Sequence, residues 1–124
     1  MDAVHSAARD AGRDPEEITT VVVTKFHPAS LVRGLYELGV RDVGESRHQE
    51  AAPKHEEVRD LDLTWHFVGQ LQSNKALAVS SYCQVIHSLD RSSLVNKLAQ
   101  AASVVDVFIE LNLTDDPGRG GVWP

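Results

Sequence analysis

The chain has 124 residues, 42% of them hydrophobic and 24% charged, which is the balance of one folded domain and disfavours disorder. Twelve Lys and Arg against eighteen Asp and Glu give a formal net charge of −6, so a dedicated nucleic-acid binder, which must neutralise phosphates, is not expected. The sequence contains neither a membrane-length apolar run nor the pattern of a secretory leader, and a single cysteine, Cys83, excludes an internal disulfide. We therefore expect a cytoplasmic protein with no membrane partner.

Short β-prone runs alternate with helix-like stretches along the chain. A helix is expected over residues 2–11, ended by Gly12. Strands are predicted over 21–24, 41–44, 64–68, 84–87 and 106–111, with helices over 28–38, 46–58, 73–80 and from Asp90 or Ser92 to 102 between them. Pro53 is expected to bend or interrupt its helix, and Ser73 to cap the helix that follows it.

The alternation predicts a parallel α/β architecture. The strands are almost continuously apolar, as expected when both faces of a sheet are covered. Two layouts fit this pattern: an open doubly wound sheet, or part of a (β/α)₈ barrel. A complete barrel needs roughly 200–250 residues, so five strand–helix steps amount to only part of one.

Polar residues follow the predicted strands, where α/β proteins place their functional sites. They are Lys25, Glu45-Ser46, Gly69-Gln70, His87-Ser88 and Asn112. Alternation along the first strand places Val21, Val23 and Lys25 on one face. A desolvated lysine there would have a lowered pKa and an amine free for Schiff-base chemistry. From spacing alone, a lysine that simply extends into water is the favoured interpretation.

A metal site is a second hypothesis. His66 and His87 lie in neighbouring predicted strands, and Glu45 could add a carboxylate, a ligand set that suits zinc. No His-x-His or His-Glu-x-x-His motif occurs, so a hydrogen-bonded core histidine is favoured for His66. The remaining histidines are expected to be exposed, and Cys83 to be structural.

A phosphate-binding loop is a third candidate. Gly118-Arg119-Gly120-Gly121 is rich in the backbone N–H groups that can cradle phosphates. It matches neither a Walker loop nor a dinucleotide fingerprint, so a flexible loop after the fifth strand is favoured.

Four segments resemble those of one known family. They are Val-Val-Val-Thr-Lys-Phe-His-Pro-Ala (21–29), Arg-Asp-Val-Gly-Glu-Ser-Arg-His-Gln-Glu (41–50), Trp-His-Phe-Val-Gly-Gln-Leu-Gln-Ser-Asn-Lys (65–75) and Ile-His-Ser-Leu-Asp (86–90). In this order and at these separations they resemble the pyridoxal phosphate homeostasis proteins, relatives of the alanine racemase N-terminal barrel. The resemblance runs from about residue 3 to residue 121.

The resemblance implies a barrel in which Lys25 carries pyridoxal 5′-phosphate (PLP) as a Schiff base. It also places Ser46, His87 and Ser88 among the cofactor-binding residues. Ser46 stands where the family has an asparagine near the cofactor ring, so contacts to the ring are expected to be weaker. The implied function is that of a PLP carrier or buffer without robust catalysis. The alternatives left open are a racemase-like enzyme of the same fold, a metal hydrolase and an inert fragment.

Family members run to about 230 residues, so residues 1–124 would form the N-terminal part of the barrel. The resemblance implies that the phosphate-gripping loops, and an arginine near the pyridine nitrogen, belong to the remaining part. We therefore expect a truncated product or a fragment with impaired PLP binding. A part-barrel also has two sheet edges. The intact family is expected to be monomeric, while this chain is expected to self-associate.

Overall fold

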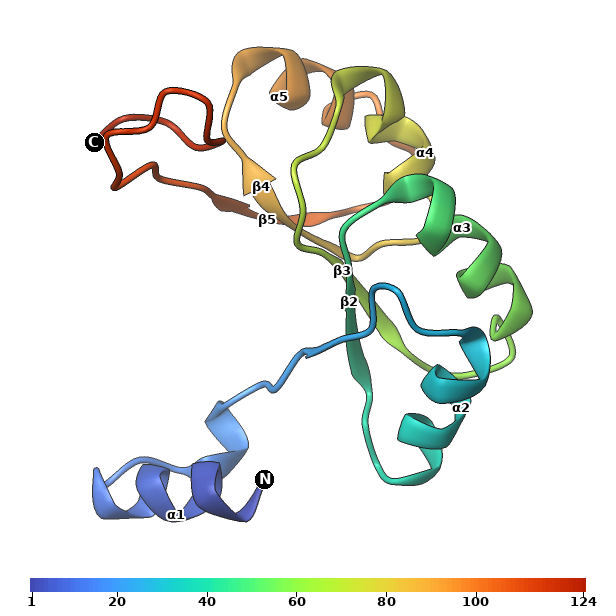
Figure 1. Ribbon diagram of the computed structural model, residues 1–124, viewed down its shortest axis with the longest axis vertical. Coiled ribbons are helices and arrows are strands. Elements are labelled where there is room, and N and C mark those ends of the chain that lie inside the picture. The colour runs from blue at the N-terminus through green and yellow to red at the C-terminus, as the bar shows by residue number, and fades with distance from the viewer.

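Five parallel strands form one sheet in the computed structural model, which describes all 124 residues (Figure 1). They are β1 (Val22–Val23), β2 (Asp42–Glu45), β3 (Thr64–Phe67), β4 (Val85–Leu89) and β5 (Asp106–Ile109). Each strand pairs in parallel with its neighbours in chain order, β1-β2-β3-β4-β5. A doubly wound sheet would reverse this order at a switch point. The unbroken order is that of a (β/α)₈ barrel, so the predicted partial barrel is confirmed.

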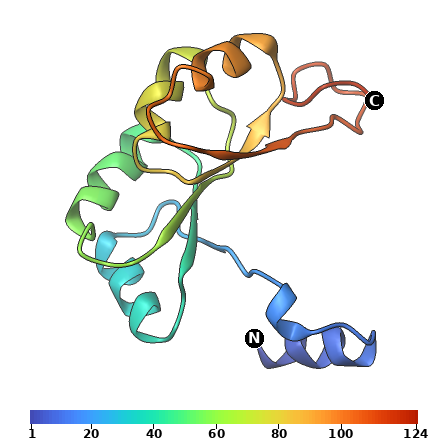
Figure 2. The same cartoon turned by 180° about the vertical axis from the view of Figure 1, so that it is seen from behind.

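Four helices cover one face of this sheet, as Figures 1 and 2 show from opposite sides. They are α2 (Ala29–Glu37), α3 (His48–Glu57), α4 (Ala76–Ser80) and α5 (Ser92–Leu98), with a 3-10 turn, η2 (Ser73–Lys75), leading into α4. The N-terminal helix α1 (Asp2–Asp10) packs on a second 3-10 turn, η1 (Pro15–Glu17), and both lie away from the sheet. No helix is long and apolar enough to cross a membrane.

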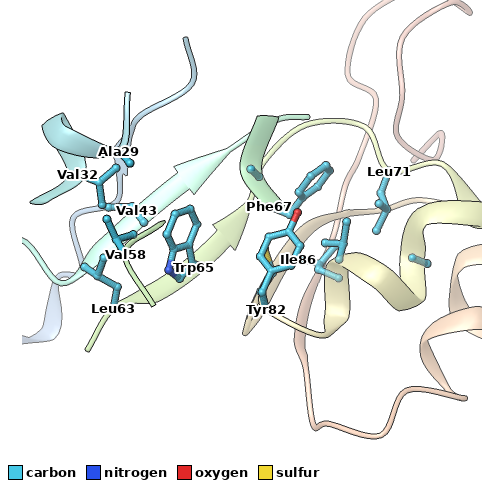
Figure 3. Close-up of a cluster of buried hydrophobic side chains, with 14 of the residues drawn as sticks. Ala29, Val32, Val43, Val58, Leu63, Trp65, Phe67, Leu71, Tyr82 and Ile86 are labelled. Carbon is cyan, nitrogen blue, oxygen red and sulfur yellow. The ribbon is translucent and has the colours of Figure 1, made fainter. Parts of the chain in front are cut away.

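The hydrophobic core lies between the sheet and these helices (Figure 3). Because side chains alternate along a strand, every second strand residue points into this layer. The sheet supplies Val43, Trp65, Phe67 and Ile86, and the helices supply Val32, Val58, Val79 and Leu94. All eight are almost fully buried, so the helix-covered face is a packed core.

The opposite side of the sheet, here called the open face, carries no helix. A Cβ on Gly44 would contact Val21, Val23 and Val68, which identifies these residues as neighbours on that face. Large apolar side chains remain accessible to solvent here, Phe108 of β5 at 58% among them. All four residues of β5 are exposed, because no helix follows that strand.

Three details of the helices differ from the sequence-based expectation. Pro53 does not interrupt α3, which runs through it as one helix. Proline removes one intrahelical hydrogen bond, and the packing of Ala51 and Val58 holds the turns on either side. The last helix ends at Leu98 rather than at residue 102. Ser73 bonds through its hydroxyl to Ser93 instead of capping a helix.

Candidate functional site

A cavity of about 560 Å³ lies at the carboxyl ends of β1, β2 and β3. It brings together Lys25 and Ser46, two of the four residues predicted to bind the cofactor. Gly69 lets the chain after β3 approach Ser46 closely, since a Cβ there would lie 2.5 Å from the Ser46 carbonyl oxygen. The remaining lining residues are Val23, Phe26, Arg47, Glu50, Val68 and Gln70.

Lys25 lies on the rim of this cavity and is exposed to solvent. The desolvation considered for it from the sequence is therefore not seen in this chain. Phe26 follows with a φ of 68°, the only positive φ at a residue other than glycine. The Phe26 ring lies 5.9 Å from Lys25 Nζ and 5.6 Å from the Arg47 guanidinium carbon, so both cations approach the same aromatic ring.

The turn that carries Lys25 is held from the helix side. The Phe26 N–H donates to a carboxylate oxygen of Glu50, and Lys54 Nζ donates to the Thr24 carbonyl oxygen at 3.0 Å. Partial burial alone would raise the pKa of Glu50. The hydrogen bonds from Phe26 and Lys54 outweigh it and lower that pKa, so the carboxyl is ionised at neutral pH.

The walls of the cavity fit the aldehyde end and the ring of PLP. Lys25 supplies the amine, Val23 and Val68 supply apolar surface, and Ser46 and Gln70 supply short polar groups. Besides Lys25, Arg47 is the only cation in the lining, so little here would neutralise a phosphate dianion.

His87 lies in a different cavity, of about 600 Å³, formed on the open face by the amino-terminal halves of the strands. There His66 Nε2 lies 2.9 Å from an Asp42 carboxylate oxygen, and His66 Nδ1 lies 2.9 Å from His87 Nε2. The His87 ring stacks on Phe108 with the centroids 5.0 Å apart. Burial, with a smaller effect from His66, lowers the pKa of His87. The favoured interpretation of His66, a hydrogen-bonded histidine, agrees with this geometry.

Ser88, the fourth predicted residue, lines neither cavity. It is almost fully buried within β4, and its hydroxyl has no hydrogen-bond partner. The structure therefore brings Lys25 and Ser46 together and leaves His87 and Ser88 apart from them. The cofactor-binding assignment of all four residues stays a prediction.

The three residues of the metal hypothesis do not converge. Glu45 alternates with Gly44 and so points to the helix-covered side, where Lys54 Nζ lies 2.6 Å from its carboxylate. His66 and His87 bond to each other on the open face. No group of three or more His, Cys, Asp and Glu side chains is arranged to hold a metal ion.

Three of the histidines expected to be exposed are partly buried: His5 on α1, and His48 and His55 on α3. His48 Nδ1 lies 3.0 Å from the Tyr82 hydroxyl, and the His55 ring packs edge-on against Trp65 with centroids 5.3 Å apart. Cys83 is buried beside them, and burial, with a smaller effect from Glu45, raises the pKa of its thiol to about 12. Such a thiol is not a nucleophile at neutral pH, so the structural interpretation of Cys83 stands.

The glycine-rich segment after β5 folds back on the sheet. The Asn112 N–H donates to the Val122 carbonyl at 2.8 Å, and the Gly121 N–H donates to an Asp90 carboxylate oxygen at 3.0 Å. A carboxylate therefore occupies one of the N–H groups that a phosphate would need. This contact gives the phosphate-loop hypothesis no support.

Similar proteins were found in two of three comparisons; no family model matches the chain. The pyridoxal phosphate homeostasis protein of Pseudomonas aeruginosa is 35% identical over an aligned length of 125 residues, and the match covers 98% of this chain and 54% of the relative. That of Aquifex aeolicus is 36% identical, with 100% of this chain and 56% of the relative covered. The chain thus spans about half the length of the curated relatives it matches.

Solved structures give the same result. PipY of Synechococcus elongatus PCC7942, solved without PLP, is 34% identical with a TM-score of 0.80 over 96% of this chain and 58% of that one. The same protein with PLP bound has a TM-score of 0.77, and again 58% of it is covered. At this identity and with this shared fold, nearly the whole chain is similar to about half of a pyridoxal phosphate homeostasis protein.

Proposed function

We propose that this chain binds PLP covalently through the Lys25 amine and contributes to PLP homeostasis as a cofactor carrier or buffer. The observation that supports this most is the cavity that joins Lys25 to Ser46 at the carboxyl ends of the strands. The likeness to PipY adds weight, since PipY has been solved with PLP bound. Cofactor sites of barrels lie at this end of the strands.

When bound, PLP supplies an aldehyde that condenses with a neutral lysine amine to give a Schiff base. In this proposal Lys25 holds the cofactor, and Val23 and Val68 exclude water from one side of its ring. Ser46 offers a single hydroxyl toward the ring where the resemblance implies an amide, so fewer hydrogen bonds are available. His87 and Ser88 complete the proposed set, although neither lines the Lys25 cavity.

The chain corresponds, in this proposal, to the N-terminal part of the family's barrel. The cavity holds only Arg47 as a second cation and is open on one side of the sheet. A Schiff base on an exposed lysine hydrolyses readily unless the phosphate is anchored, because the anchor makes re-formation intramolecular. We therefore expect weaker PLP binding than in a full-length relative.

A racemase-like activity is less well supported. Racemisation needs a second acid or base on the opposite face of the cofactor ring. Tyr82 is buried on the helix-covered side, and Tyr36 stacks with Arg41, whose guanidinium carbon lies 3.7 Å from the ring. Neither tyrosine lines the Lys25 cavity. A non-catalytic binding role therefore agrees better with the geometry.

We also propose that the chain self-associates through the β5 edge and that full-length relatives do not. Val107, Phe108 and Ile109 of β5 are exposed, and an unpaired strand edge offers free backbone donors and acceptors. Sedimentation velocity should show concentration-dependent dimers or larger species. Ile109→Lys should shift the distribution to monomer, and a monomer at all concentrations before the substitution would refute this proposal.

The proposed PLP site is tested by trapping. The chain is incubated with PLP and reduced with borohydride, and the modified lysine is located by mass spectrometry alongside the absorbance band of the bound cofactor. Lys25→Ala should abolish the band, while Lys97→Ala, on the exposed side of α5, should leave it unchanged. PLP trapped equally well in Lys25→Ala would refute the assignment. Full-length PipY serves as the reference for affinity.

A further inference from the structure

A buried ion cluster lies behind the turn that carries Lys25. It consists of Glu45 at the end of β2 and of Glu50 and Lys54 on α3. From its contacts we infer that Glu50, which also lines the Lys25 cavity, and Lys54 are positioning residues that set the direction of the Lys25 side chain. This inference rests on the proposed function of Lys25.

Lys54 is the centre of the cluster, and its ammonium is fully occupied. Nζ lies 2.6 Å from a Glu45 carboxylate oxygen, 3.2 Å from a Glu50 carboxylate oxygen and 3.0 Å from the Thr24 carbonyl oxygen. An ammonium has three protons, so each has one acceptor. The Lys54 side chain is only 5% exposed, which makes these bonds a fixed feature rather than a solvated surface contact.

Glu50 connects this ammonium to the other side of Lys25. The same Glu50 oxygen that accepts from Lys54 also accepts the Phe26 N–H. Lys54 therefore holds the backbone of residue 24, and Glu50 holds that of residue 26. Lys54 and Glu50 thus hydrogen-bond to the two peptide units on either side of Lys25.

The backbone conformation of Phe26 requires such hydrogen bonds. Its φ of 68° lies in the left-handed region, which a bulky side chain rarely adopts without support. The chain reverses over residues 24–27, where the His27 N–H donates to the Thr24 carbonyl at 3.1 Å. Without the bond to Glu50, Phe26 would lose the only hydrogen bond of its own N–H, and an ordinary φ there would reorient the adjoining residues.

The strand itself gives Lys25 little direction. β1 contains two residues, lies at the edge of the sheet and pairs only with β2. Beyond it, Thr24 turns to the helix-covered side, where its hydroxyl donates to Glu45 at 2.8 Å. Lys25 turns to the open face as a consequence. The ion cluster therefore determines which face of the sheet the side chains of Thr24 and Lys25 point to, where the sheet hydrogen bonds end.

A purely structural role is the competing explanation, and it predicts a different outcome. If the cluster only stabilised the fold, variants that remain folded would leave Lys25 as reactive as before. If the cluster positions Lys25, the folded variants in which the turn at residues 24–27 becomes more mobile should also show a lower rate of reaction at Lys25. Lys25 reactivity and the order of the turn must therefore be measured separately.

The variants are Glu50→Ala, Glu50→Gln, Lys54→Met and Lys54→Arg, with Glu57→Ala as the matched control. Glu57 lies on the same helix with an exposed carboxylate that forms no salt bridge. Glu50→Gln keeps an acceptor for Phe26 while removing the charge opposite Lys54, and Lys54→Arg keeps the charge. Urea denaturation identifies the variants that remain folded. If Glu50→Ala and Lys54→Met unfold, the conservative variants Glu50→Gln and Lys54→Arg still allow the measurement.

The first readout is hydrogen exchange of the Phe26 amide, which needs no cofactor. Glu50→Ala should accelerate it by about tenfold or more, because the amide loses its acceptor. The second readout is the rate at which Lys25 reacts, both with an acetylating reagent and with PLP trapped by borohydride. In Glu50→Ala and Lys54→Met the trapping rate should fall roughly ten- to a hundredfold, a loss typical of a misplaced reacting group. Lys54→Arg should recover part of it, and Glu57→Ala should change neither readout.

The outcomes separate the two proposals. If the starting chain traps no PLP at Lys25, the proposed function fails, whereas Phe26 exchange and Lys25 acetylation still test the positioning role. If folded Glu50 and Lys54 variants show a freely exchanging Phe26 amide but unchanged Lys25 reactivity, the positioning role is refuted. The positioning role is supported if folded variants lose both the protection of the Phe26 amide and the reactivity of Lys25, and if Lys54→Arg recovers part of that reactivity.

Discussion

The two faces of the sheet carry side chains of similar character in very different environments. On the helix-covered face Phe67 is 2% exposed, and on the open face Phe108 is 58% exposed. Both are phenylalanines on strands of the same sheet. The difference arises because α2 to α5 pack on one side only (Figures 1 and 2). The position of Phe108 on the edge strand β5, all of whose residues are exposed, adds to it.

This comparison divides the molecule by function as well as by packing. The covered face holds the core and the Glu45–Lys54 pair, and it gives the chain its stability. The open face holds the Lys25 cavity, which carries the proposed chemistry, and the separate His66–His87 pair. The matched part is about half of a full-length relative, and we expect the remaining residues of such a protein to close the open face.

The largest expected effect comes from truncating a buried ring. Phe67→Ala should lower the free energy of unfolding by about 3–5 kcal/mol, because it removes buried apolar surface and leaves a cavity. Phe108→Ala is the matched control on the open face and should cost about 1 kcal/mol or less. Urea denaturation of both variants tests the comparison directly. Equal losses would mean that the open face is covered in solution, as self-association would cause.

The buried ion pair should give the next largest effect. Glu45→Ala leaves the Lys54 ammonium buried without its shortest partner and should cost about 3 kcal/mol or more. Replacing both residues with apolar ones, as in Glu45→Leu with Lys54→Met, should cost less than the single change, because no uncompensated charge remains. Chemical denaturation of the single and double variants measures this. A double variant worse than the single one would contradict the argument.

Several features of this cluster could have been predicted from the sequence. Val43 and Glu45 share one strand face, so an apolar Val43 in the core already places Glu45 on the helix side. Lys54 lies three residues after Ala51 and four before Val58, and this spacing puts it on the buried face of α3. Glu45 ends a strand, but this alternation turns its side chain to the helix side and away from the Lys25 cavity.

Other features depend on tertiary contacts and carried no local signal. The left-handed Phe26 is held by Glu50, which lies 24 residues away, so no turn motif marks it. The partly buried His48 and His55 depend on Tyr82 and Trp65, which come from other elements. The exposure of β5 depends on what packs beside it, while its apolar sequence predicts a buried strand. The fold and the strand-end residues of the Lys25 cavity followed from local periodicity, whereas the contacts that hold the turn at Phe26 did not.

A histidine from each face should respond to acid. Burial lowers the pKa of both His55, under the helices, and His87, on the open face, below the ordinary value of 6.5. Above that value both are neutral whether the chain is folded or not. As the pH falls below it, the unfolded chain takes up protons that the folded chain resists, so stability decreases.

The free energy of unfolding should therefore fall between about pH 7 and about pH 5, and His55→Gln and His87→Gln should each flatten that slope. Exposed His27→Gln is the control. If water entering the open face solvates His87, the effect of His87→Gln will be smaller than that of His55→Gln. A slope unaffected by either variant would show that other groups cause the acid sensitivity.

The smallest expected effect concerns Phe26, which lies where the two faces meet. Its ring is 70% exposed, so replacing it loses little packing, while its φ of 68° is strained for any residue except glycine. Phe26→Gly should therefore stabilise the chain by up to about 1 kcal/mol, less the entropy that glycine adds to the unfolded state. The matched control is Leu31→Gly on α2, partly exposed but helical, which should cost about 1 kcal/mol. Urea denaturation of the two variants should thus give changes of opposite sign. If Phe26→Gly destabilises as much as Leu31→Gly, the ring stabilises the turn through Lys25 and Arg47, and its strain is offset by those cation–π contacts.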